Sequence, residues 1–190
     1  LQYISSRDLG DLDIAMKLAQ GLANAPMPTV GPNARRHAIT QLQAAAFVFR
    51  AVYAKVTTLR SSIREEAGDS TVLEAELAAE LEELDASYEG LMVIMASGSI
   101  ANPELHLQLE LDLAYAHEEW DRALESVNKL IAAGARFDSA KMLVAADVAM
   151  RAGDVGAAAT FIDDVIARRP DLQGDASFAL IRARLAFQSG

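Results

Sequence analysis

The sequence has no cysteine and few residues that break helices. Without cysteine, disulfides, thiolate zinc sites and cysteine nucleophiles are excluded. Its 190 residues include only 5 prolines and 11 glycines, against 37 alanines. Because alanine has the highest helix propensity and contributes little to a sheet face, this composition predicts an all-α protein.

Basic charge is also scarce, with 17 basic residues against 27 acidic ones and a net charge of −10. A phosphate backbone requires a basic surface, so we expect no nucleic-acid partner. This exclusion applies least to the locally basic segment 34–64.

Long apolar runs are missing as well. The longest, residues 91–96, is far shorter than the ~20 residues that span a bilayer, so no membrane span is expected. The first residue is Leu and no basic-then-apolar leader follows, which suggests a mature or trimmed chain. The compartment, cytoplasmic or periplasmic, stays open.

The residue patterns that catalysis and metal binding require are absent from the sequence. The histidines are His37, His106 and His117, and none belongs to a Glu-x-x-His or His-Glu-x-x-His pattern. No phosphate-binding glycine loop and no nucleophile elbow is found. His106 and Glu110 share a helical face, which we interpret as a surface histidine on an acidic helix. We therefore expect neither an enzyme nor a bound metal or cofactor.

Proline and glycine divide the chain into segments with helical apolar spacing. This spacing predicts helices at 1–9, 11–25, 34–66, 71–97, 104–117, 120–133, 139–152, 155–168 and 175–189. Asn33, Ser70 and Asn102 stand where N-caps are expected, and Pro103 stands at a first helical position.

The segments 34–66 and 71–97 differ from the others in length and in the regularity of their apolar residues. These recur at alternating spacings of three and four, at Leu42, Ala45, Phe49, Val52, Val56, Leu59 and Ile63, and at Leu73, Leu77, Leu81, Leu84, Tyr88, Leu91 and Met95. Such heptad seams, joined by a short turn, predict a long antiparallel helical hairpin over 33–98, with a basic arm against an acidic arm. Two separate helices of a larger bundle are the alternative. The run 91–95 is apolar all round its helix and requires at least two neighbours, either helices 11–25 and 104–117 or another subunit.

The shorter helices repeat. Ala123 and Ala158 are 35 residues apart, and aligning them also aligns Leu107 with Met142, Leu111 with Ala146, Val127 with Ile162, and Leu130 with Val165. A third unit begins near Gly174. Near the start of the chain, Gly10-Asp11 and Ala15 have the spacing of Gly153-Asp154 and Ala158, which predicts a turn at Gly10. A small residue at such a position lets two antiparallel helices approach closely.

A unit of this length, with two helices, a Gly-Asp turn and a close-packed alanine, resembles the tetratricopeptide repeat (TPR) family. The resemblance is best over 104–190 and covers 1–27 as a partial repeat, so residues 1–190 are expected to form one helical-repeat domain interrupted by the hairpin. Other helical-hairpin repeats and a non-repeat bundle are the alternatives. The resemblance implies an α-solenoid, a right-handed superhelical stack whose groove is lined by the first helix of each pair. It assigns to that groove Gln108, Asp112, Tyr115, Leu143, Asp147, Met150, Arg151, Leu180, Arg184 and Phe187. A solvated helix face is the alternative interpretation of these residues.

The predicted function is that of a non-catalytic scaffold or adaptor that binds a protein or peptide partner. The alternatives are a structural module that forms homo-oligomers through the hairpin, and a regulatory domain of a larger protein. We interpret Trp120 as a packing residue, with a partner anchor as the alternative. The sequence names neither the partner nor the pathway.

Overall fold

A computed structural model describes residues 6–26, 33–66, 70–97, 100, 102–171 and 176–189. Side chains are described at all of these except residues 6–14, 176, 177, 180, 188 and 189. Within these ranges the chain is all-α, as the composition predicts, and contains no strand. The helices are α1 (Ser6–Ala23), α2 (Ala34–Glu65), α3 (Thr71–Ser97), α4 (Pro103–Ala116), α5 (Trp120–Ala132), α6 (Ser139–Arg151), α7 (Val155–Arg168) and α8 (Ala176–Ser189).

From α2 onwards, every helix begins and ends within one residue of its predicted bounds. Pro103 is the first residue of α4, and Asn33 precedes α2, although its side chain makes no capping hydrogen bond. The turn predicted at Gly10-Asp11 is wrong, because both residues lie inside α1. A single glycine inside a helix lowers the stability of the helix but is tolerated there.

The chain divides into two compact units, residues 1–102 (unit 1) and 103–190 (unit 2). Unit 1 contains α1 to α3, and unit 2 contains α4 to α8. The description of the whole chain as a single helical-repeat domain stays a prediction.

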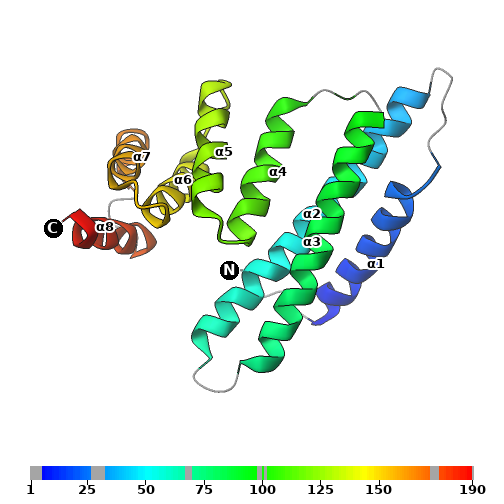
Figure 1. Ribbon diagram of the computed structural model, residues 1–190, viewed down its shortest axis with the longest axis horizontal. Coiled ribbons are helices and arrows are strands. Elements are labelled where there is room, and N and C mark those ends of the chain that lie inside the picture. Colours follow the sequence, from blue (N-terminus) through cyan, green and yellow to red (C-terminus); the bar gives the residue numbers. More distant parts are fainter. Residues whose placement is uncertain are drawn as a thin grey trace. The chain divides into compact units, whose positions relative to one another are not determined.

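In unit 1, α2 and α3 form an antiparallel hairpin, and α1 packs against α2 (Figure 1). The Lys55 Nζ lies 3.3 Å from the Glu80 Oε1, and the rings of Phe49 and Tyr88 lie 6.4 Å apart. Phe49 thus contacts residue 88 and Lys55 contacts residue 80, so α3 runs in the direction opposite to α2. The structure therefore has the predicted hairpin, with an ion pair between its basic and acidic arms.

The seam of the hairpin supplies the core of unit 1. Phe49, Val52 and Val56 of α2 and Leu84 and Leu91 of α3 are completely buried. The apolar run 91–95 is only partly covered, since Ile94 is buried whereas Val93 is 66% exposed. The described helices of the chain therefore leave Val93 uncovered, and its cover by another subunit stays a prediction.

Unit 2 repeats one hydrogen-bonded turn at a spacing of 35 residues. After α4, Glu118 has a φ of 58° and the Glu119 N–H donates to the Ala114 carbonyl at 2.9 Å. After α6, Gly153 has a φ of 81° and the Asp154 N–H donates to the Ala149 carbonyl at 2.8 Å. Both are Schellman-type helix ends, in which the left-handed residue follows the C-cap.

Each of these turns leads into a helix that carries a completely buried alanine in its first turns. Ala123 of α5 and Ala158 of α7 lie five residues after the left-handed residue, and both are completely buried. The pairs α4–α5 and α6–α7 are thus two hairpins with the same turn and the same buried alanine (Figure 1).

Candidate partner-binding site

Four polar and aromatic side chains from three helices of unit 2 meet in one cluster. The Tyr115 hydroxyl of α4 donates to the Asp147 Oδ2 of α6 at 2.9 Å. The Arg151 Nε of α6 donates to the same oxygen at 2.8 Å. The Arg151 guanidinium lies 4.6 Å from the centre of the Trp120 ring of α5, which packs edge-on against Tyr115 at 5.3 Å. We call these four residues the α4–α6 cluster.

The local sequence explains how these side chains reach one another. Asp147 and Arg151 are four residues apart on α6 and therefore share one face of the helix. Tyr115 is in the last turn of α4, and Trp120 opens α5 directly after the turn at Glu118. The tight turn brings the two rings together.

The cluster is partly exposed and internally bonded. The side chains of Arg151 and Asp147 are 27% and 18% exposed. The Asp147 carboxylate holds the guanidinium on one side, and the Trp120 ring attracts it through a cation–π contact. Because these contacts already restrict the side chains, a partner that docks on them would order few additional rotamers.

The remaining predicted groove residues are found in different surroundings. Gln108 is half-buried on α4, where its amide donates to the Glu104 carboxylate at 3.3 Å. Asp112 and Leu143 are half-buried, and Leu143 packs against the core of unit 2. Met150 is 4% exposed and is a core residue rather than a surface residue.

The predicted residues of α8 are on a third helix. Arg184 is exposed, and Phe187 is 89% exposed. The side chain of Leu180 lies outside the described residues. Of all the predicted groove residues, the structure joins Tyr115, Asp147 and Arg151, through the two hydrogen bonds that Asp147 accepts.

Trp120 is the member of the cluster that the resemblance did not assign to the groove. It is the one tryptophan of the sequence. Its contacts with Tyr115 and Arg151 agree with its interpretation as a packing residue beside the preceding turn. The sequence position of Trp120, five residues after Tyr115 and on the other side of a short turn, would have indicated that the two rings lie close together.

Within the described part of the chain, no group of three His, Asp or Glu side chains could hold a metal ion. On α4, the His106 Nε2 lies 3.6 Å from the Glu110 Oε1, one turn further along the helix. Among the helices that were described, none combines the length and the apolar character needed to cross a membrane.

Comparison with known proteins found no matching family model, and neither a curated protein nor a solved structure matches the chain significantly.

Proposed function

We propose that this protein is a non-catalytic scaffold or adaptor that binds a protein or peptide partner through the α4–α6 cluster. The observation that carries the proposal is the meeting of Tyr115, Trp120, Asp147 and Arg151 at a partly exposed position. Tryptophan, tyrosine and arginine are the residues that most often dominate the binding energy of protein interfaces.

The repeated turn of unit 2 supports a TPR-like arrangement for this surface. In such an arrangement the first helices of successive pairs lie side by side, and α4 and α6 are the first helices of the two pairs. The hydrogen bond from Tyr115 to Asp147 joins these two helices, 32 residues apart in sequence. An α-solenoid with a peptide-binding groove is therefore the architecture that we propose for unit 2.

The test is a charge exchange inside the cluster. The double variant Asp147→Lys/Arg151→Glu keeps opposite charges four residues apart and leaves the net charge unchanged, so the fold of α6 should be retained. Proteins captured from a lysate of the source organism by the immobilised chain would be identified by mass spectrometry. Each would then be titrated against the purified variants by calorimetry.

We expect the double variant to bind the true partner at least ~10-fold more weakly, because the guanidinium and the carboxylate exchange places. The exposed Lys129 of α5 supplies the control, since Lys129→Glu changes the net charge outside the cluster. A partner that binds the double variant and the wild type with equal affinity would remove this surface from consideration.

Oligomerisation through the hairpin is the second candidate function. The seam itself is buried within unit 1, so an oligomer would have to use the outer faces of the hairpin. Phe47 of α2 and Val72 of α3 are 42% and 78% exposed, and such exposed apolar side chains favour contact with a second copy. Light scattering at increasing concentration tests this, and a constant monomer mass would exclude it.

A regulatory domain of a larger protein is a further alternative. It would use the same α4–α6 cluster and would give the same result in the charge-exchange experiment.

A further inference from the structure

Unit 1 contains a groove that the packing of its own helices leaves unfilled. Its floor is α2, and its walls are α1 and α3. The lining is mostly small and apolar, and includes Ala23, Ala45, Val48, Ala86, Gly90 and Val93. Its volume is about 450 Å³, roughly three times the ~150 Å³ of an apolar cavity that holds one benzene. About three apolar side chains would fill it.

Gly90 of α3 gives a first indication of what the groove accommodates. A Cβ added at Gly90 would meet no heavy atom within 4 Å, so packing within the chain does not require glycine there. Glycine in a helix interior is less favourable than alanine, and a missing side chain lets another backbone approach closely. Val93, one turn further along α3, is 66% exposed and turns apolar surface towards the same space.

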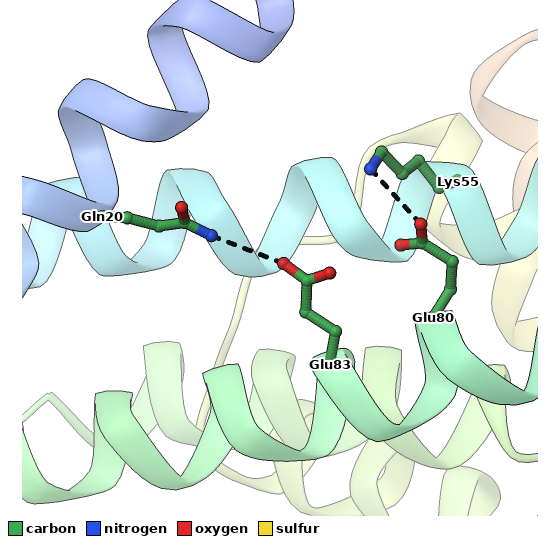
Figure 2. Close-up of polar contacts among 4 residues, drawn as sticks. All are labelled: Gln20, Lys55, Glu80 and Glu83. Atoms are coloured by element: carbon green, nitrogen blue, oxygen red, sulfur yellow. Dashed lines mark hydrogen bonds and ion pairs between the residues drawn. The ribbon is translucent and has the colours of Figure 1, made fainter.

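The charged side chains of α3 beside the groove are all acidic. Gln20, which lines the groove, donates from its amide to the Glu83 Oε1 at 3.4 Å (Figure 2). Among the described side chains, no lysine or arginine lies within ion-pair distance of Glu83. Glu82 and Glu89 of the same helix are exposed, and α3 contains no basic residue at all. Within the described part of unit 1, the Glu83 carboxylate is therefore oriented by a neutral amide and has no cation at ion-pair distance.

We propose that this groove binds one amphipathic helix of a partner protein, with apolar side chains in the groove and lysine or arginine beside Glu83. The lining extends over two turns of α3, from Ala86 to Ile94. A helix presents side chains at i, i+3 or i+4, and i+7 along one face over that length, which matches the volume. Positive charge on the flanks of the helix complements the acidic edge. A second copy of the chain joined through α3 would instead oppose one acidic helix to another.

The experiment uses the full chain and a designed probe. The probe is a fluorescein-labelled 18-residue helix with leucine at every third or fourth position, lysine on both flanks and alanine elsewhere. A second peptide has glutamate in place of each lysine. Binding is followed by fluorescence anisotropy with the wild type and with Gly90→Ala, Gly90→Leu, Glu83→Gln and Ala78→Leu. Ala78→Leu is the matched control, because Ala78 is an exposed residue of α3 that does not line the groove.

We expect the lysine peptide to bind the wild type with a Kd below ~100 µM and the glutamate peptide not to bind. Gly90→Leu should weaken binding at least ~10-fold by filling the groove, and Glu83→Gln should weaken it ~3- to 10-fold. Ala78→Leu should leave the Kd within about twofold of wild type. Gly90→Ala should raise Tm by about 1–4 °C and still weaken binding, which separates the groove from general stability.

Three results would overturn the proposal. The first is no binding of the lysine peptide to the wild type at ~100 µM. The second is equal binding by Gly90→Leu and Ala78→Leu, which would mean that the peptide follows the net charge of the chain. The third is self-association of the wild type that Gly90→Leu abolishes in light scattering, which would place a second copy in the groove. The variants all lie in unit 1, so the outcome is independent of the test of the α4–α6 cluster in unit 2.

Discussion

Glu118 adopts a left-handed backbone conformation that its equivalent, Gly153, adopts without cost. A side chain at positive φ costs roughly 1 kcal/mol relative to glycine, because the Cβ approaches the following carbonyl. We expect Glu118→Gly to raise the free energy of unfolding by about 0.5–1 kcal/mol, measured by urea denaturation.

The reverse change at the equivalent position is the control for Glu118. Gly153→Ala should lower the free energy of unfolding by about 1 kcal/mol, since its φ is 81°. If Glu118→Gly proved destabilising, the side chain of Glu118 would contribute more than its backbone conformation costs.

The exposed pair Glu125 and Lys129 on α5 gives a prediction about pH. The Lys129 ammonium, 2.8 Å from the Glu125 carboxylate, lowers the pKa of Glu125 by a hydrogen bond and by its charge. A carboxylate with a lowered folded-state pKa stabilises the fold at pH values above its ordinary pKa. That contribution is lost as pH falls through the lowered value. We expect Lys129→Met to return the pKa of Glu125 towards its ordinary value in an NMR titration of the side-chain carboxyl carbon. Lys141→Met on α6 should leave it unchanged.

At the residue scale, the sequence identified three of the four members of the α4–α6 cluster. Tyr115, Asp147 and Arg151 are among the residues that the resemblance to the TPR family assigns to the groove. The bond between Tyr115 and Asp147 was not predicted, since it depends on how closely two helices 32 residues apart approach. The resemblance also assigns Met150 to the groove, but Met150 is buried in the core of unit 2.

At the scale of the helices, apolar periodicity predicted both ends of the seven helices α2 to α8 to within one residue. It worked because these helices begin or end at proline, glycine or capping residues, as α7 does at Asp154, whose side chain accepts from the Ala157 N–H. It failed at Gly10, where the same Gly-Asp pair lies inside α1. The Gly-Asp pair forms a turn at Gly153, where two helices pack against each other, but not at Gly10, within a single helix.

Two phenylalanines of α2 test the hairpin. Phe49 is completely buried and contacts Tyr88, whereas Phe47 is 42% exposed. Phe49→Ala should therefore lower the free energy of unfolding by about 3–5 kcal/mol through the lost burial and the cavity it leaves. Phe47→Ala, the matched control two residues away, should cost about 1 kcal/mol or less. Thermal or urea unfolding monitored by circular dichroism measures both, and similar losses would contradict the packing described for α2.

At the scale of the whole molecule, the chain has two cores. The core of unit 2 consists of residues between Leu107 and Leu185, and that of unit 1 is the seam of the hairpin with α1. A unit with its own core can fold alone. We expect residues 103–190, expressed alone, to show a helical circular dichroism spectrum and cooperative thermal unfolding.

A cut inside unit 2 is the control for this fragment. Residues 135–190 lack Ala123, Val127 and Leu130, which are buried in the core of the unit. This shorter fragment should therefore unfold without a cooperative transition. Failure of residues 103–190 to fold would show that unit 2 depends on residues outside it.

The distribution of burial along the hairpin also determines where the molecule opens first. The buried side chains of α2 lie between Ala38 and Val56, and those of α3 between Leu84 and Ile94. None of the described residues 57–66 and 71–83 is fully buried. Because local opening requires less free energy where few contacts are buried, amide hydrogens beyond Val56 should exchange with deuterium faster than those before it. The exchange rate of the amide hydrogens of α2 would then rise along its length of ~48 Å towards the turn of the hairpin. Opening would begin at that turn and proceed towards the half of the hairpin that carries the groove.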